Sequence, residues 1–291
     1  MSILINKNTR VIVQGITGRE AAVYSLDMLN YGTQIVAGVS PSQGGIWVLD
    51  EKVPVFDSMR TAVEATEANT SIMFVPAHRA ADALFEAADS GVETVVCMTE
   101  GLPVQDVSKA CEYFRTRGVR LIGPNTPGVI IPGEQKLGVY PSDCVIPGKI
   151  GVITRSSTLS YMIMAEMKAH GIGVSTCVGI GGDVICGTTF VDALELFEND
   201  PHTERVLLIG EPGGMEECRA AKYAAYHMSK PVVGFLTGLN IPEGKRLTHT
   251  GAYVDGGVGT TREKLEAFRS AGIPVTTNVF EVVEMLGGEK E

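Results

Sequence analysis

The chain has 291 residues, of which 44% are hydrophobic and 20% are charged, a balance typical of an ordinary soluble globular protein. That length allows two domains. The 34 acidic and 24 basic residues give a formal charge of −10, which argues against nucleic acid or an anionic membrane as the main partner. Local groups must therefore hold any anionic ligand.

The N-terminal segment has no signal-peptide layout, and no apolar run approaches the roughly 20 residues that a membrane span needs. The six cysteines are scattered and form no CxxC pair. We therefore expect a reduced, cytoplasmic protein without a structural metal site.

The first half of the chain alternates short apolar runs with helical patterns. We expect strands at 10–14, 35–39, 71–75, 92–98 and 119–122, and helices from 19, at 58–65, at 79–88 and at 104–117. The strands are almost wholly apolar, which is typical of a parallel sheet covered on both faces.

The same alternation returns after a stretch rich in proline and glycine. The second set of strands is expected at 149–154, 173–178, 205–210 and 231–236, with helices at 157–169, 190–198, 215–227 and 261–271. The fold class is thus α/β with two doubly wound halves. We expect domains at 1–125 and 149–291, joined by a linker or crossing segment at 126–148.

Ligands of open parallel sheets bind beyond the carboxyl ends of the strands. The first such end, Gly15-Ile16-Thr17-Gly18, resembles a dinucleotide fingerprint but lacks its third glycine, since Ala21 follows Glu20. The second strand ends without an acidic residue that could bind a ribose. NAD is therefore disfavoured, while an adenine-bearing ligand with differently placed phosphates remains open.

In the second half, the segment 155–158 directly precedes a helix, where backbone N–H groups and hydroxyls favour an anion. Plain N-capping is the alternative interpretation.

Glu211 ends an apolar strand beside glycines, where it could orient a histidine. His249 follows Lys245 and Arg246 in a glycine-rich loop and is the candidate nucleophile for phosphorus. A lone loop histidine is more often a simple hydrogen-bonding group, but its neighbours here favour phosphoryl transfer. No GxxxxGK[ST] loop is present, so the nucleotide site must lie elsewhere.

Five motifs stand in the order found in a known family: Gly-Ile-Thr-Gly at 15–18, Gly-Pro-Asn-x-Pro-Gly at 123–128, Ser-Thr-Cys-Val-Gly-Ile-Gly-Gly-Asp at 175–183, Ile-Gly-Glu-x-Gly-Gly at 209–214 and Gly-Lys-Arg-x-x-His-x-Gly-Ala at 244–252. On these motifs the chain resembles the alpha subunits of succinyl-CoA synthetases (succinate–CoA ligases) along essentially its whole length.

The resemblance implies an N-terminal Rossmann-like CoA-binding domain and a C-terminal flavodoxin-like ligase domain. It also implies a beta subunit with an ATP-grasp domain, which would bind ATP or GTP with Mg²⁺ in an αβ or α₂β₂ assembly. The implied reaction interconverts an acid, CoA and a nucleoside triphosphate with acyl-CoA, the diphosphate and phosphate. It passes through an acyl phosphate and a phosphohistidine.

The family roles carry over residue by residue. His249 matches the phosphorylated histidine and Glu211 the carboxylate that holds it. Positions expected to contact CoA are Thr17, Gly18, Arg19, Glu20, Gln43, Pro76, Met98, Thr99 and Glu100. Positions expected to bind the acid or phosphate are Asn125, Ser156, Ser157, Thr158 and Tyr161, the last together with the beta subunit. No metal ligands are expected in this chain.

The chain departs from the family pattern at five positions. Gln43 replaces a lysine expected to reach the CoA phosphates, and Thr126 replaces a cysteine. Ser157, Met162 and Thr248 replace a glycine, a glutamate and a glycine. Several of these lie near the phosphate and acyl groups, so malate or citrate are alternatives to succinate. A CoA-binding regulatory protein without turnover is a further alternative, which the retained His249 and Glu211 disfavour.

Overall fold

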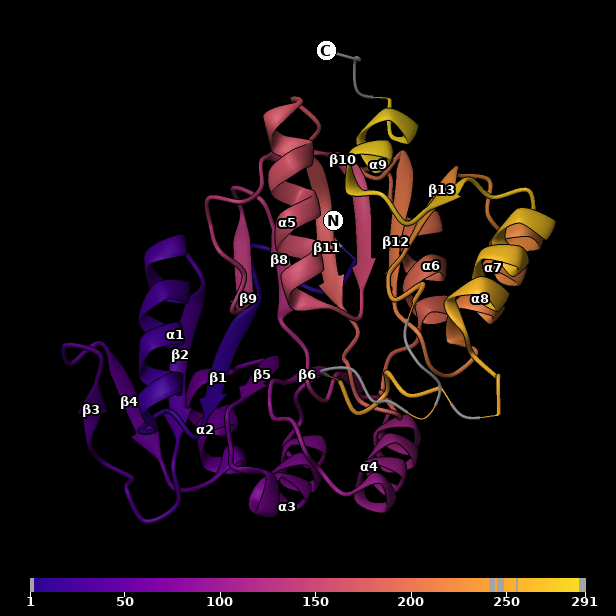
Figure 1. Ribbon diagram of the computed structural model, residues 1–291. Helices are drawn as coiled ribbons and strands as arrows, with labels where there is room; N and C mark the ends of the chain where they lie inside the picture. The colour runs from indigo at the N-terminus through magenta and orange to yellow at the C-terminus, as the bar shows by residue number, and fades with distance from the viewer. Residues whose placement is uncertain (1–2, 241–243, 245–248, 255, 288–291) are drawn as a thin grey trace.

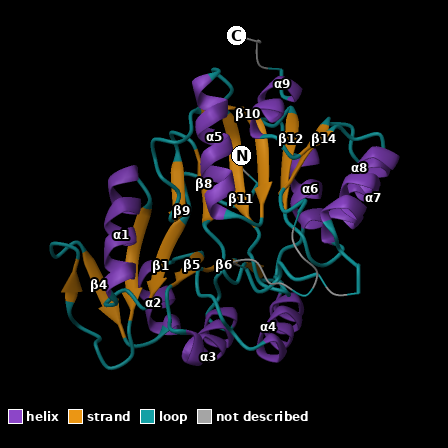
Figure 2. Ribbon diagram, viewed as in Figure 1, coloured by secondary structure: helices purple, strands orange, loops and turns teal. Residues whose placement is uncertain are grey.

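The computed structural model describes residues 3–240, 244, 249–254 and 256–287. The chain forms two α/β halves, each built on a seven-stranded sheet (Figures 1 and 2). The expected fold class is therefore confirmed. No helix among the described residues is long and apolar enough to cross a membrane.

The first sheet has the strand order β3-β4-β2-β1-β5-β6-β7. Its strands are β1 (Arg10–Gln14), β2 (Gln34–Val39), β3 (Trp47–Val48), β4 (Val53–Phe56), β5 (Thr70–Met73), β6 (Thr94–Cys97) and β7 (Arg120–Ile122). All neighbouring pairs are parallel except β3 and β4. The short β3–β4 pair was not expected from the sequence, because two residues of strand leave no periodic signal.

Helices cover both faces of this sheet. They are α1 (Arg19–Tyr31), α2 (Met59–Thr66), α3 (Ala77–Ala88) and α4 (Val104–Arg117). Buried residues of α2, α3 and α4 share one apolar core, whereas α1 contributes Ala21 and Met28 to a core that continues into the second sheet. The two halves therefore pack against each other through the α1 face.

The second sheet has the strand order β14-β13-β12-β10-β11-β8-β9. Its strands are β8 (Gly128–Ile131), β9 (Gln135–Gly138), β10 (Pro147–Thr154), β11 (Val174–Gly179), β12 (Arg205–Gly210), β13 (Val232–Leu236) and β14 (Val275–Thr276). The helices α5 (Ser157–Ala169) and α9 (Val279–Met285) share one core, and α6 (Phe190–Glu198), α7 (Glu216–His227) and α8 (Thr261–Ser270) share another.

The stretch 126–148, expected to be only a linker, contributes two strands to this sheet. β8 pairs antiparallel with β11, and β9 with β8. The hairpin is fixed by long-range contacts to the first half. Lys136 is buried, and its ammonium group donates to Asp27 on α1 at 2.5 Å and to Ser142 at 2.8 Å. Because Asp27 lies 109 residues from Lys136 in sequence, local patterning could not reveal the strands.

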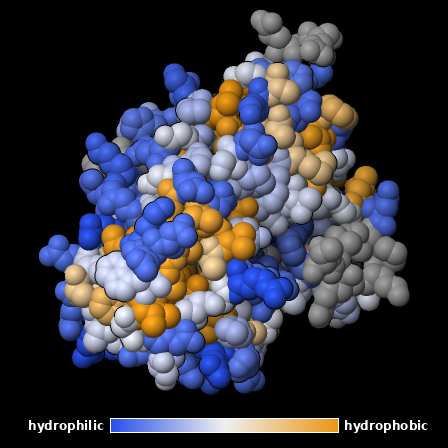
Figure 3. Space-filling model, turned by 90° about the vertical axis from the view of Figure 1, so that its left-hand side faces the viewer, coloured by the Kyte–Doolittle hydropathy of each residue, from blue (hydrophilic) through white to orange (hydrophobic). Residues whose placement is uncertain are grey.

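Val23 and Leu26 of α1 and Trp47 of β3 are exposed. Figure 3 shows hydrophobic residues gathered on this side of the molecule. None of the three lines either of the two cavities described below. The chemistry of those cavities therefore depends on other residues.

Candidate active site

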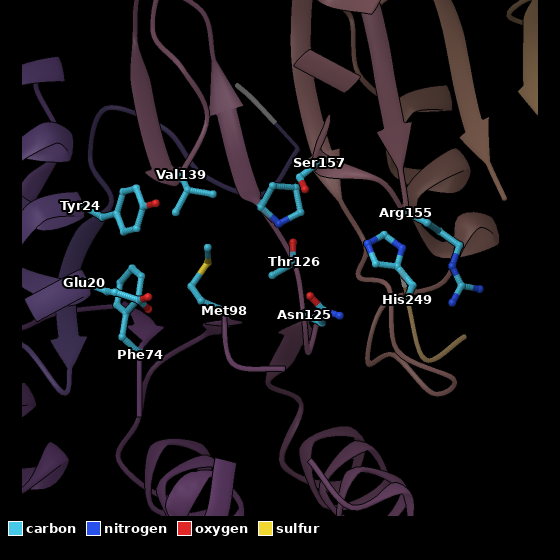
Figure 4. Close-up of a pocket in the computed structure, with 11 residues that line it drawn as sticks. Glu20, Tyr24, Phe74, Met98, Asn125, Thr126, Val139, Arg155, Ser157 and His249 are labelled. Atoms are coloured by element: carbon cyan, nitrogen blue, oxygen red, sulfur yellow. The ribbon is translucent and has the colours of Figure 1, made fainter. Parts of the chain in front are cut away.

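The carboxyl edges of the two sheets face a common cavity of about 230 Å³. Its lining comes from both halves of the chain: Glu20, Tyr24, Phe74 and Met98 from the first, and Val139, Arg155, Ser157 and His249 from the second, with Asn125, Thr126 and Pro127 between them. Figure 4 shows His249 and Arg155 at one end and Glu20, Tyr24 and Phe74 at the other. The rings of Tyr24 and Phe74 stack with centroids 6.1 Å apart, which gives that end a rigid apolar wall.

At the polar end, His249 Nδ1 lies 2.7 Å from Glu211 Oε2. Glu211 follows the last residue of β12, and its side chain is only 5% exposed. A carboxylate accepts hydrogen bonds but does not donate them, so Nδ1 carries the proton and Nε2 keeps its lone pair. The arrangement fixes the tautomer in which Nε2 is the nucleophilic atom.

The hydrogen bond that His249 Nδ1–H donates to Glu211 raises the pKa of His249 above its ordinary value of 6.5. Burial of the ring and the nearby Arg155 guanidinium oppose that shift, while the carboxylate of Asp183 adds to it. The raised pKa means that Glu211 stabilises positive charge on the imidazole. The same interaction would stabilise the charge that develops when the ring attacks phosphorus.

Arg155 is the charged neighbour of the His249–Glu211 pair. It follows β10, its Nε lies 3.3 Å from Glu211 Oε1, and its Nη2 donates to the backbone oxygen of Asp183 at 2.7 Å. Neither Arg155 Nε nor Glu211 Oε1 has a well-aligned hydrogen-bond partner among the described residues. Their interaction is therefore mainly electrostatic, and it places a buried cation beside the cavity.

The carboxylate of Asp183 ties the histidine segment to the connection between the two halves. Its Oδ1 accepts from Asn125 Nδ2 at 3.2 Å and from Thr250 Oγ1 at 3.0 Å. The backbone adds a bond from Gly182 N–H to the oxygen of Asn125 at 2.9 Å. Asn125 lies in the left-handed region with φ 56°, which asparagine tolerates better than most residues.

Gly182 lies directly against the imidazole. A Cβ atom there would be 2.7 Å from His249 Cγ, too close for any real contact. The glycine-rich segment after β11 is therefore required for the histidine to approach the site.

The start of α5 faces the same cavity. Ser156 is the N-cap, and its hydroxyl accepts from Leu159 N–H at 3.4 Å, while Ser157 lines the cavity. Both expected roles of this segment, capping and an anion-favouring helix start, are compatible with that geometry. Tyr161 does not line the cavity, and its ring packs edge-on against Tyr140.

A second cavity, of about 720 Å³, lies in the first half at the ends of β1, β2 and β5. Four residues expected to contact CoA line it, namely Thr17, Gly18, Gln43 and Pro76. Phe74 lines both cavities, so the two are neighbours. Gly18 caps α1 without a side-chain hydrogen bond, which leaves backbone N–H groups of the helix start available to an anion.

Other expected residues lie elsewhere. Arg19, Thr99, Glu100, Ser156 and Thr158 line neither cavity. The Thr99 hydroxyl donates to the backbone oxygen of Val75 at 2.6 Å and so holds neighbouring strand ends together. Thr126 donates to the oxygen of Gly179 at 2.5 Å, which makes its hydroxyl part of the scaffold. Lys245, Arg246 and Thr248 lie outside the described residues.

Besides the rings of Tyr24 and Phe74, the residues Arg155, Asp183 and Arg79 of the two sites were not among those expected. Arg155 and Asp183 belong to motifs that the sequence displays, but their side-chain roles depend on contacts 28 residues apart. Arg79 lies in the first turn of α3, just beyond a strand end, and among the described residues lining the larger cavity it is the one lysine or arginine. A search of the first helical turn after each strand end would have found it.

The comparisons with known proteins agree with this architecture. Residues 6–101 match the CoA binding domain family, and residues 153–273 match the CoA-ligase family. The chain is 49% identical over 286 residues to subunit alpha 2 of an ADP-forming succinate–CoA ligase of Archaeoglobus fulgidus, which covers 98% of this chain and 99% of that protein. The chain belongs to the succinate–CoA ligase alpha-subunit family.

A second relative, the alpha subunit of the ADP-forming succinate–CoA ligase of Aquifex aeolicus, is 47% identical, with 98% of this chain and 93% of that protein covered. Among solved structures, ATP citrate lyase from Methanothrix soehngenii has the same fold, with a TM-score of 0.85 at 23% identity over 99% of this chain. The chain spans about half of that protein, 52% of its length. The expected CoA-ligase class is thus confirmed.

Proposed function

We propose that this chain is the phosphohistidine-bearing subunit of an ADP-forming succinate–CoA ligase. The observation that carries the proposal is the 2.7 Å contact between His249 Nδ1 and Glu211, at a cavity shared by the CoA-binding and ligase halves. The names of the relatives support succinate as the acid and ATP as the nucleotide.

In the first step, His249 Nε2 attacks the γ-phosphorus of ATP. A nitrogen–phosphorus bond forms, the bond to the β-phosphate oxygen breaks, and ADP leaves. Glu211 stabilises the charge on the ring throughout, because it accepts the Nδ1 proton in a hydrogen bond without removing it. The start of α5, at Ser157, faces the cavity, and the backbone N–H groups there would stabilise the negative charge of the transferred phosphoryl group.

In the second step, a carboxylate oxygen of succinate attacks the phosphorus, and the nitrogen–phosphorus bond breaks to give the acyl phosphate. In the third, the thiol sulfur of the substrate CoA bonds to the acyl carbon, the carbon–oxygen bond to the phosphate breaks, and inorganic phosphate leaves with the thiol proton. The stacked rings of Tyr24 and Phe74 form the wall of the cavity opposite His249. Arg155 provides the buried positive charge at the other end.

The residues present fit CoA. The larger cavity combines a glycine turn, an uncapped helix start and the cation Arg79, and it adjoins the smaller cavity at Phe74. A bound CoA could therefore place its phosphates in the first half and its thiol near His249. ATP and Mg²⁺ would be bound by an ATP-grasp beta subunit, a partner that the naming of the relatives as alpha subunits supports.

The test uses the chain copurified with its beta subunit and incubated with γ-labelled ATP. We expect an acid-labile phosphoprotein band on this chain that disappears on addition of ADP, or of succinate with CoA. His249→Ala should fold normally but take up no label. Turnover by His249→Ala near the wild-type rate would refute the phosphohistidine route. A panel of succinate, malate and citrate then decides the acid, and greater turnover with either alternative would correct the substrate.

A further inference from the structure

A buried ion pair lies behind the active site, outside both cavities. Lys264 on α8 and Glu217 on α7 are both 0% exposed, and their charged groups are in direct contact. The two helices lie side by side on one face of the second sheet (Figure 1). Isolated charges are costly to bury, so a pair without access to water needs every hydrogen bond satisfied.

The three donors of the Lys264 ammonium group are all used. One bonds the Glu217 carboxylate, and the other two donate to the backbone oxygens of Glu211 at 2.6 Å and of Gly213 at 2.7 Å. The other carboxylate oxygen of Glu217 accepts from Glu211 N–H at 3.2 Å. The pair thus holds both the backbone N–H and the backbone oxygen of Glu211.

The chain leaves room for this arrangement at the end of β12. A Cβ atom on Gly210 would lie 2.6 Å from Glu217 Cγ, so only glycine allows the Glu217 side chain to lie directly under the strand end. Glu217 also lies in the first turn of α7, where a negative charge is favoured by the helix dipole.

Two interpretations of the pair are possible. The pair could simply join α7 to α8, a task that apolar side chains of similar volume perform equally well. However, two of the three acceptors of Lys264 belong to the segment that carries Glu211, not to a helix. We propose that Lys264 and Glu217 are positioning residues that fix the backbone of Glu211, so that its carboxylate meets His249 Nδ1 in the geometry needed for phosphoryl transfer. The inference rests on the proposed function of His249.

The experiment compares Glu217→Gln and Lys264→Met with Lys136→Met in the complex with the beta subunit. Lys136 is the matched control, because it is also a fully buried lysine in an ion pair but lies at the junction of α1 and β9. Four quantities are measured: the melting temperature, the single-turnover rate of His249 phosphorylation, the KM for CoA, and the His249 pKa by NMR.

We expect Glu217→Gln to slow phosphorylation by about 10–100-fold, the range found when a residue that orients a functional side chain is replaced. The KM for CoA should stay unchanged, and the His249 pKa should fall towards its ordinary value. Lys136→Met should lower the melting temperature while leaving the phosphorylation rate and the His249 pKa as in the wild type.

The double variant Lys264→Met with Glu217→Leu separates the two interpretations even if Lys264→Met alone does not fold. Replacement of both charges removes the uncompensated buried charge, so the melting temperature should rise above that of Lys264→Met, while the phosphorylation rate should stay low. Recovery of both would overturn the proposal, as would a wild-type rate and a wild-type His249 pKa in Glu217→Gln. If the wild type itself is never phosphorylated, the proposed function fails, whereas the pKa comparison still tests whether the pair positions Glu211.

Discussion

At the scale of single residues, the site depends on one contact between two side chains 38 positions apart. Glu211 is buried beside Arg155 and His249, so its charge acts in a medium of low polarity where electrostatic interactions are strong. The sequence indicated this pair, because a carboxylate at a strand end among glycines has no packing role. It could not indicate Arg155 or Asp183 as supports, since their contacts arise only when β10 and β11 lie side by side.

We predict that Glu211→Gln slows His249 phosphorylation by about 2–4 kcal/mol in activation free energy, as is common when a preorganised electrostatic partner is removed. The amide can still hold the ring but cannot stabilise its positive charge. Single-turnover phosphorylation measures the effect, with CoA binding as the control. An unchanged rate would mean that Glu211 is only structural.

The raised pKa of His249 predicts the pH dependence of phosphorylation and of stability. Nε2 must be unprotonated to attack, so the phosphorylation rate should rise with pH with a midpoint above 6.5, and Glu211→Gln should lower that midpoint. The groups facing the ring are Glu211, Arg155 and Asp183.

For folding, a raised pKa contributes stability that is complete below 6.5 and is lost as the pH rises through the folded-state pKa. The free energy of unfolding of the wild type should therefore exceed that of Glu211→Gln by more at about pH 6 than at about pH 8. Equal differences at both pH values, measured by urea unfolding, would mean that the contact does not favour the charged imidazole.

At the scale of elements, the sequence predicted those with strong periodicity and missed those made by distant contacts. The bounds of α4, α5 and α6 agree with the expected ranges, because each helix has a clear apolar face and recognisable ends. The strands β3, β4, β8, β9 and β14 were missed. Two of them, β3 and β14, have only two residues; β4 contains Pro54; β8 and β9 lie in the stretch rich in proline and glycine. The β8–β9 hairpin also has Pro127 next to it and depends on packing against α1.

The first turn of α5 allows capping and ligand binding to be separated. Ser156→Ala should lower the free energy of unfolding by about 1 kcal/mol, because it removes the N-cap acceptor for Leu159 N–H. Ser157→Ala should cost less stability but slow turnover more, because Ser157, and not Ser156, lines the cavity. Thermal unfolding and steady-state kinetics of both variants test this, and the reverse order of effects would contradict the assignment.

At the scale of the whole molecule, the active site exists only because two sheets present their carboxyl edges to one cavity. The core that includes Val11 and Val13 of β1 continues through Val129 and Leu137 of the hairpin, so one of the apolar cores spans both halves. The motifs predicted two doubly wound halves, but only the structure shows how the CoA cavity and the His249 cavity adjoin at Phe74.

The net charge of −10 opposes the approach of an anionic ligand such as CoA, so binding must depend on local cations. Arg79 is the one such group among the described residues that line the larger cavity, where Gln43 is exposed and uncharged. Gln43→Lys should therefore tighten CoA binding by about 1 kcal/mol, the usual value of a partly exposed ion pair. Arg79→Gln should weaken it by a similar amount.

The matched control is Gln105→Lys, which makes the same change on the exposed side of α4, away from both cavities. Both lysine variants alter the overall charge by one unit, so any difference between them is local. Calorimetric titration of CoA at two salt concentrations should show a gain for Gln43→Lys that shrinks as salt rises, because exposed charges are screened over about 10 Å at 0.1 M. The gain should appear in the KM for CoA and not in kcat, since a remote phosphate contact stabilises ground and transition states alike. An equal gain for Gln105→Lys would assign the effect to the overall field, and no gain for Gln43→Lys at either salt concentration would show that its loop does not reach the phosphates.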